Sequence, residues 1–215
     1  MNGFFITGTD TDVGKTIVAA WLLAHLDALH LEPCYWKPVQ AGAEPETDAQ
    51  TVRRLAELAP DRILPEAYLL DEAIAPHEAA RRAGIRIDMA KLVPPSTDRL
   101  LVVEGAGGLL VPLDDKSYVI DLATELSLPV ILVARSTLGT INHTLLSLEA
   151  LGRRGLPVAG IVLNGPDTPH NRAAIERYGR VRVIAEIPRL ETVTRDALLR
   201  IAPELDLAQL AQARP

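Results

Sequence analysis

The sequence predicts an α/β fold in which a mostly parallel central sheet is covered by helices on both faces. Short apolar segments alternate with longer amphipathic ones along the chain, which is typical of parallel strands joined by crossover helices. The apolar segments are continuous rather than alternating, so we expect the strands to be buried on both faces. With 215 residues, the chain is long enough for a full hydrophobic core, and we expect residues 1–215 to form a single domain.

The apolar segments predict strands at residues 3–7, 34–39, 99–105, 128–134, 158–164 and 181–187. The amphipathic segments predict helices at about 14–30, 47–59, 76–83, 117–126, 139–154 and 169–178, with one more at about 204–213. Gly152, Gly155 and Pro157 mark the end of one helix and the start of the next strand. The proline-rich stretches 60–76 and 93–97 are predicted to be loops.

The composition excludes several classes of protein. The net charge is -6, and no basic cluster is longer than a pair, which argues against a nucleic-acid-binding surface. The single cysteine, Cys34, has no partner for an internal disulfide, which suits a reducing cytosol. The sequence shows no signal peptide and no apolar run near the roughly 20 residues that span a bilayer. We therefore expect a cytoplasmic protein that binds neither nucleic acid nor a membrane.

The segment GTDTDVGKT, residues 8–16, lies between the first predicted strand and the first predicted helix. This context predicts a phosphate-binding loop, because backbone N–H groups at a helix N-terminus attract an anion. We expect Lys15 to contact the terminal phosphates and the Thr16 hydroxyl to bind magnesium. The segment departs from the pattern G-x-x-x-x-G-K-[ST], since Thr9 stands at the first glycine position. The alternative is an ordinary glycine turn with a surface lysine.

Two acidic residues are candidates for further magnesium ligands, because this ion prefers oxygen ligands. Glu104 follows the apolar run LLVV at a predicted strand end, where a charged side chain has no packing role. The glycine-rich segment 105–108 after it allows a ligand to approach the backbone closely. Asp48 is the second candidate, although Thr47 and Asp48 are equally typical of a helix cap.

Lys37 lies in the apolar stretch CYWKPV, just before Pro38, at the end of the second predicted strand. A lysine on an exposed edge strand would be the simplest explanation. In a central strand, however, its ammonium group must meet an anion, and we expect it at the ligand-binding edge of the sheet, facing the phosphates held by Lys15. Two lysines on one polyphosphate would stabilise the charge that develops during phosphoryl transfer.

Other polar residues give weaker signals. Asn142 and His143 follow Gly139 near a predicted helix start, where a turn, a cap and a structural histidine are the common explanations. The five histidines have no metal-ligand spacing, and no G-x-S-x-G segment occurs.

Taken together, the motifs resemble those of dethiobiotin synthetases, the ATP-dependent enzymes of biotin synthesis. The matching segments, in the family's order, are GTDTDVGKT, WKPVQAG, VVEGAGGLLVP, LGTINHTLL, GIVLNG and EIPRL, from about residue 3 to 190. The resemblance implies a P-loop NTPase-like fold and a ligase reaction. Members join CO2 to 7,8-diaminononanoate (diaminopelargonate) with ATP, through a carbamate and a carbamic–phosphoric anhydride, and release dethiobiotin, ADP and phosphate.

The resemblance also implies roles for individual residues. Lys37, Lys15 and Thr11 match catalytic positions, and Thr16, Asp48 and Glu104 match the Mg2+-binding positions. The positions implied for the nucleotide are Gly8, Asp12, Val13, Gly14, Lys15, Thr16, Ile17, Asp48, Glu104, Gly105, Ala106, Gly107, Asn164, Gly165, Pro188, Arg189 and Leu190. Those implied for the diamine are Thr11, Lys37, Ala41, Gly107, Leu138 and Asn142. In this family the position of Asn142 helps to bind the substrate carboxylate across a subunit interface, so a homodimer is implied.

Two positions depart from the family pattern, and other functions remain as alternatives. Ala41 stands where Ser or Thr is common, which removes a hydrogen bond typically worth about 0.5–1.5 kcal/mol. Asp12 stands where Glu is common. The main alternative is a ParA- or MinD-like switch ATPase, but that class carries a second lysine where this chain has Asp10. A related synthetase with an added glutaminase domain and a non-catalytic nucleotide sensor are further alternatives.

Overall fold

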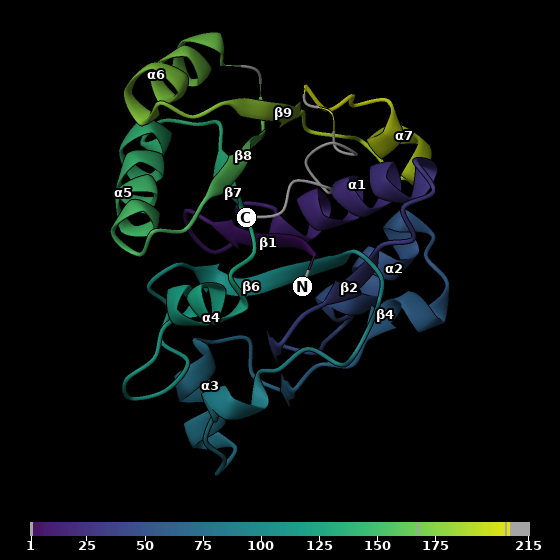
Figure 1. Cartoon of the computed structure of the whole chain (residues 1–215), viewed down its shortest axis with the longest axis vertical. Coiled ribbons are helices and arrows are strands. Elements are labelled where there is room, and N and C mark those ends of the chain that lie inside the picture. The colour runs from purple at the N-terminus through teal and green to yellow at the C-terminus, as the bar shows by residue number, and fades with distance from the viewer. Residues whose placement is uncertain (1, 167, 205, 207–215) are drawn as a thin grey trace.

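The computed structural model describes residues 2–166, 168–204 and 206, and its centre is a seven-stranded sheet (Figure 1). The strands, in spatial order, are β4 (Ile63–Leu64), β2 (Cys34–Trp36), β6 (Leu101–Gly108), β1 (Gly3–Gly8), β7 (Val130–Arg135), β8 (Val158–Asn164) and β9 (Val183–Ile187). Each neighbouring pair is parallel. The predicted α/β fold with a parallel sheet is therefore confirmed.

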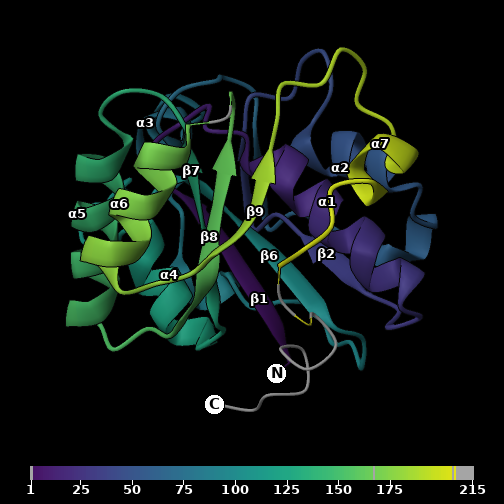
Figure 2. The same ribbon diagram turned by 90° about the horizontal axis from the view of Figure 1, so that it is seen from above.

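Helices cover both faces of this sheet (Figure 2). One face carries α1 (Lys15–Ala28), α2 (Asp48–Ala56) and α7 (Arg195–Leu199). The opposite face carries α4 (Val119–Leu126), α5 (Thr140–Arg153) and α6 (Pro169–Gly179). None of the helices in the described part of the chain is long and apolar enough to cross a membrane.

Successive residues of the central strand β1 contribute to two different cores. Phe4 and Ile6 belong to the apolar cluster on the α1 side, whereas Phe5 belongs to the cluster that contains residues of α4. Because side chains of a strand alternate between the two faces of a sheet, both faces of β1 must be apolar. This double burial explains the continuous apolar run GFFI that predicted the strand.

The predicted strand at 34–39 is in fact two strands. β2 ends at Trp36, and β3 (Val39–Ala41) pairs with β5 (Tyr68–Leu70) in a separate two-stranded sheet. Pro38 lies at the break, where it has no N–H group to continue the hydrogen-bond ladder. The helix α3 (Pro76–Arg82) contacts this small sheet.

The other differences between the predicted and the observed elements occur where the elements are too short to show a hydrophobic period. The stretch 60–76 was predicted to be a loop, which is wrong, because it contains a 3-10 turn (Pro60–Arg62), β4 and β5. Strands of two or three residues show no hydrophobic period. The five-residue helix α7 was also not predicted. The helix predicted at about 204–213 lies almost entirely outside the described residues.

The strand order determines where a ligand can bind. From β1 the chain continues to β2 on one side of the sheet, and from β6 it crosses to β7 on the other side. The segments that follow β1 and β6 therefore leave a crevice at the carboxyl ends of the strands, which is the usual ligand site of an open parallel sheet.

Candidate active site

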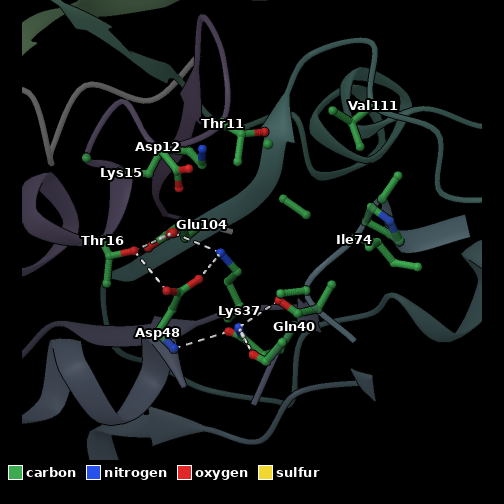
Figure 3. Close-up of a pocket in the computed structure, with 18 of the residues that line it drawn as sticks. Thr11, Asp12, Lys15, Thr16, Lys37, Gln40, Asp48, Ile74, Glu104 and Val111 are labelled. Atoms are coloured by element: carbon green, nitrogen blue, oxygen red, sulfur yellow. Dashed lines mark hydrogen bonds and ion pairs between the residues drawn. The ribbon is translucent and has the colours of Figure 1, made fainter. Parts of the chain in front are cut away.

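A cavity of about 820 Å³ lies at this crevice, between the loop after β1 and the segments around β2, β3 and β6 (Figure 3). Much of its wall consists of residues that the sequence predicted for the site. These residues are Thr11, Asp12, Gly14, Lys15, Thr16, Ile17, Lys37, Ala41, Asp48, Glu104, Ala106 and Gly107.

The loop of residues 8–16 joins β1 to α1, as predicted, and Gly14 is the N-cap of this helix. Gly14 has a φ of 92°, in the left-handed region that favours glycine. A Cβ atom at this position would lie 1.9 Å from Nδ2 of Asn164. That amide donates a hydrogen bond to the carbonyl oxygen of Val13 at 2.9 Å. Asn164 at the end of β8 therefore packs directly on the loop, and only glycine leaves room for it.

The side chain of Asp10 contacts its own loop and Arg135 of β7. One carboxylate oxygen accepts the backbone N–H of Thr11 at 2.8 Å, and the other lies 2.5 Å from Nη2 of Arg135. The backbone carbonyl of Asp10 accepts a hydrogen bond from Nζ of Lys15 at 3.2 Å. The carboxylate at this position is thus paired with a guanidinium group, which reduces its repulsion of an anion in the loop.

Lys37 connects two of the predicted acidic residues (Figure 3). Its Nζ atom lies 2.5 Å from Oδ2 of Asp48 and 2.8 Å from Oε1 of Glu104. Lys37 and Glu104 are only 4% and 1% exposed. Each of these two charges needs the other as its partner, because burying an unpaired charge costs a large amount of free energy. The side chain follows β2 at the ligand-binding edge, where the sequence predicted it, and its observed partners are these carboxylates.

Glu104 lies within β6, which continues to Gly108 instead of ending at 105 as predicted. Its neighbour on β1 is Ile6, two residues before the start of the phosphate-binding loop at Gly8. This register brings the carboxylate close to Thr16, whose Oγ1 lies 3.1 Å from Oε1 of Glu104. The same hydroxyl lies 3.1 Å from Oδ1 of Asp48.

The position of Asp48 resolves the two roles that its sequence context allowed. The cap of α2 is Thr47, whose hydroxyl accepts the N–H of Gln50, while the Gln50 side chain accepts the N–H of Thr47. The capping box is complete without the Asp48 carboxylate. This carboxylate is therefore free to contact Lys37 and Thr16.

The pKa values of these groups follow from burial and from charge pairing. Burial disfavours the charged form of Lys37, but the carboxylates of Glu104 and Asp48 outweigh this effect and raise its pKa. Burial likewise opposes ionisation of Asp48, yet Lys37 lowers the pKa of this carboxyl. Burial, together with repulsion from Lys37, lowers the pKa of Lys15. A phosphate group near Lys15 would offset both effects.

Thr16, Asp48 and Glu104 bring one hydroxyl and two carboxylates to a single point. Mg2+ is usually bound by one or two carboxylates together with substrate phosphates, so this set of donors fits the ion. No group of three or more His, Cys, Asp and Glu side chains placed to hold a metal is present among the residues that the structure describes. One hydroxyl and two carboxylates are oxygen donors that fit a hard cation sharing its ligands with a nucleotide.

The other predicted residues lie outside the walls of this cavity. Gly8, Val13 and Gly105 are buried next to it. Gly165 bonds through its N–H group to Ile187, so the ends of β8 and β9 meet beside the phosphate-binding loop. Beyond β9, Pro188 and Arg189 are exposed and Leu190 is partly buried.

Two residues predicted for the diamine, Leu138 and Asn142, are exposed near the start of α5, and neither lines the cavity. Leu138 is 100% exposed. A second cavity of about 480 Å³ lies nearby, between the loop after β1, the end of β6 and α5. The exposed side chains Leu110 and Leu146 line it. This face of the molecule therefore exposes apolar side chains beside polar ones such as Asp10, His143 and Ser147.

Sequence reasoning missed part of the first cavity. The additional lining residues are Gln40, Gly42, Glu44, Glu46, Ala73, Ile74, Ala75, Pro76 and Val111. Several belong to the stretch that was predicted to be a loop, and their position depends on the pairing of β3 with β5. The one available signal was the proline at residue 76, which is typical of the first position of a helix.

Residues 2–197 match the model of a family described as an AAA domain. The chain is 54% identical over 203 residues to the ATP-dependent dethiobiotin synthetase BioD of Paramagnetospirillum magneticum, covering 94% of this chain and 96% of that protein. It is 52% identical over 195 residues to the protein of the same name from Agrobacterium fabrum, covering 91% and 90%. A crystal structure of the cell division ATPase MinD of Pyrococcus furiosus is similar with a TM-score of 0.57 and 18% identity, covering 95% of this chain and 90% of that chain. At that identity, the likeness to MinD shows the fold alone.

Proposed function

The chain belongs to the family of ATP-dependent dethiobiotin synthetases, and from this premise we propose which of its residues carry out the reaction. It is an ATP-dependent ligase that makes dethiobiotin in biotin biosynthesis. The observation that carries the proposal is the position of Lys37, which is held between Asp48 and Glu104 beside Lys15 and Thr16. The cationic groups and oxygen ligands that phosphoryl transfer needs thus meet in one cavity.

The proposed reaction has three steps. One amine of 7,8-diaminononanoate adds to CO2, forms a carbamate and releases a proton. A carbamate oxygen then attacks the γ-phosphorus of ATP, the bond to the β-phosphate oxygen breaks, and ADP leaves with the bonding electrons. Finally the second amine attacks the carbonyl carbon of the carbamic–phosphoric anhydride, loses a proton and expels phosphate. This closes the cyclic urea of dethiobiotin.

Within these steps, Lys37 and Lys15 stabilise negative charge. The raised pKa of Lys37 keeps its ammonium group charged, so it can donate hydrogen bonds to the carbamate and the γ-phosphate. Lys15 exchanges its bond to a backbone carbonyl for one to the terminal phosphates. Thr11, which lines the cavity next to Asp12, orients the reacting groups. Ala41 lines the same wall and contacts the diamine without a side-chain hydroxyl.

Mg2+ is the proposed cofactor, and Thr16, Asp48 and Glu104 would hold it. When bound, it would supply positive charge to the β- and γ-phosphates. We propose that the rest of the nucleotide is bound by the remaining residues of the phosphate-binding loop and by residues 105–107. Its base would lie near Asn164, Gly165 and residues 188–190. The contact of Asn164 with the loop supports this arrangement.

We also propose a homodimer in which Asn142 of each subunit reaches the diamine bound in the other subunit. The full exposure of Leu138 and the exposed Leu110 and Leu146 around the second cavity support an apolar contact at this face. In a symmetric dimer, the start of α5 would meet the mouth of the partner's cavity. We propose that residues 1–215 act as one domain and that the reaction takes place in the cytoplasm, since it consumes ATP and Cys34 is a free thiol.

The experiment that tests this function follows two products. The purified chain is incubated with Mg-ATP, bicarbonate and 7,8-diaminononanoate, and both ADP and dethiobiotin are quantified. We expect equal amounts of the two products and no ADP release without the diamine. ADP release that is independent of the diamine, with no dethiobiotin, would favour the MinD-like switch instead.

A further inference from the structure

Glu104 has a buried partner that the proposed reaction does not use. The hydroxyl of Tyr35 donates a hydrogen bond to Oε2 of Glu104 at 2.9 Å, and Tyr35 is fully buried. The other carboxylate oxygen, Oε1, is the one near Lys37 and Thr16. The two oxygens of Glu104 therefore have separate partners, one in the core and one at the cavity.

The pairing of strands explains how Tyr35 reaches this carboxylate. Tyr35 of β2 is in register with Val102 of β6, and Glu104 is two residues further along β6. Residues two apart on a strand face the same side, so Tyr35, Val102 and Glu104 share the face that α1 covers. The phenol ring packs in that apolar cluster, and its hydroxyl extends along the strand to Oε2.

We propose that Tyr35 is a positioning residue for a divalent cation: its hydroxyl holds Oε2 of Glu104, so that Oε1 is directed into the cavity. This inference rests on the proposed magnesium role of Glu104. A cation at Oε1 would compete with the contact to Lys37, and the hydrogen bond from Tyr35 to Oε2 would keep the carboxylate oriented without a further loss of rotamer freedom. The ring of Tyr35 has a packing role, and the hydroxyl has the positioning role.

The environment of Tyr35 suits a permanent donor. Burial, reinforced by the charge of Glu104, raises the pKa of Tyr35 well above its usual value. The donor role rests on the geometry, since the hydroxyl of Tyr35 donates to Oε2 of Glu104 at 2.9 Å from a fully buried ring.

Tyr35→Phe tests the proposal, because it removes the hydroxyl and keeps the ring. Full-length protein is titrated with Mn2+ as the probe, and the loss of the free Mn2+ signal is followed by electron paramagnetic resonance. We expect Mn2+ to bind about tenfold more weakly than to the wild type, as is common when an outer hydrogen bond of a metal ligand is lost. Binding of ADP in the presence of EDTA should stay within about twofold, since the phosphate-binding loop is untouched. An unchanged Mn2+ affinity would overturn the proposal.

Tyr68→Phe is the matched control. The hydroxyl of Tyr68 also has a hydrogen bond, which it accepts from the backbone N–H of Asp88 at 3.0 Å, but it has no contact with Glu104. This variant should bind Mn2+ like the wild type. Glu104→Gln tests the proposed metal site separately from the positioning role of Tyr35. If Glu104→Gln binds Mn2+ as tightly as the wild type does, the proposed metal site itself is wrong, whatever Tyr35→Phe does.

A measurement on the wild-type chain covers the case in which Tyr35→Phe does not fold. The chain has four tyrosines, so tyrosine labelled with carbon-13 at Cζ gives a simple spectrum. Addition of Mg2+ should shift the Tyr35 resonance, because a cation at Oε1 withdraws charge from Oε2. The other three resonances are assigned through their Tyr→Phe variants. A Tyr35 resonance that does not move while Mg2+ binds would contradict the positioning role.

Discussion

Lys37 and Glu104 form an ion pair in which Nζ lies 2.8 Å from Oε1, and both side chains are buried. Asp48 gives Lys37 a second carboxylate at 2.5 Å. Neither charge of the buried pair would be tolerated alone. Lys37 is therefore the counter-ion of these two carboxylates as well as the proposed catalytic group, and substitutions separate these two roles.

Lys37→Met should abolish most turnover while leaving nucleotide binding intact. Loss of a group that stabilises developing charge typically lowers kcat by about 10²–10³. The Kd for ADP should change by less than about threefold, because Lys15 and the phosphate-binding loop remain. Lys91→Met, at an exposed side chain, is the control for removing a lysine. Equal losses of turnover and ADP affinity would make Lys37 a phosphate anchor only.

The stability of the same pair can be measured with a double-mutant cycle. Lys37→Met and Glu104→Gln each leave a buried charge with fewer partners, so each single variant should lower the free energy of unfolding. The double variant should lose about 1–3 kcal/mol less than the sum of the two single losses, since it leaves neither charge of the pair unpaired. Urea denaturation of the four proteins gives this coupling free energy. Simple additivity would mean that Asp48 fully replaces Glu104 as the partner of Lys37.

The features that the sequence predicted correctly are those encoded locally. The apolar run before residue 8 and the Gly14-Lys15-Thr16 segment predict a strand, a loop and a helix, because each pattern depends on near neighbours. Glu104 could be recognised because a charged side chain directly after four aliphatic residues must have a partner or a ligand. Lys37 could be recognised in the same way, because it lies inside the apolar stretch CYWKPV.

The contacts that could not be predicted from the sequence depend on which strands are neighbours in the sheet. Nothing in the segment CYWKPV indicates that Tyr35 bonds to Glu104, because this contact depends on the register between β2 and β6. The carbonyl oxygen of the Gln40 side chain accepts the backbone N–H of Asp48 at 3.2 Å, which links β3 to the start of α2. Such contacts join residues that are close in space only after the two sheets have formed.

Gly14→Ala should weaken both nucleotide binding and folding. The new methyl group would collide with Asn164, and a residue with a Cβ in the left-handed region costs roughly 1–2 kcal/mol by itself. Gly139 also has a φ of 92°, but among the described residues beyond its own chain neighbours no atom would lie within 4 Å of a Cβ there. Gly139→Ala therefore has a similar backbone cost without the collision.

We expect calorimetry to show ATP binding at least about tenfold weaker in Gly14→Ala than in Gly139→Ala, which corresponds to about 1.4 kcal/mol. Equal affinities in the two variants would mean that the contact between Asn164 and the loop does not affect the nucleotide.

The stability contributed by Asp48 should disappear in acid. Although burial opposes its ionisation, Lys37 lowers the pKa of this carboxyl in the folded state. As the pH falls below the usual value of about 3.9, the unfolded chain binds a proton at Asp48 while the folded chain does not. Low pH therefore favours unfolding: the stabilising effect of Asp48 is full above that value and is lost progressively as the pH falls toward the lower pKa of the folded state.

Urea denaturation of the wild type and Asp48→Asn between about pH 3 and pH 6 measures this contribution. The difference in the free energy of unfolding between the two proteins should decrease as the pH falls below about 4. Asp115→Asn removes a highly exposed carboxylate and serves as the control. A difference that stays constant over this range would show that the charge of Asp48 does not stabilise the fold.

Mixing two impaired variants tests the shared site of the proposed homodimer. Asn142→Ala should raise the KM for the diamine about tenfold or more and leave the KM for ATP unchanged, because a hydrogen bond to a charged group is worth about 1.5–3 kcal/mol. If Asn142 serves the partner's cavity, then a dimer of one Asn142→Ala subunit and one Lys37→Met subunit has one site with both residues intact.

After random subunit exchange, about half of the dimers are mixed and one of their two sites is intact, so the mixture should recover about a quarter of the wild-type activity at low diamine concentration. If Asn142 instead serves the cavity of its own subunit, each site of a mixed dimer keeps one of the two defects. The mixture would then show only the average of the two variants. Recovery well above that average is the result that requires a site built by two chains.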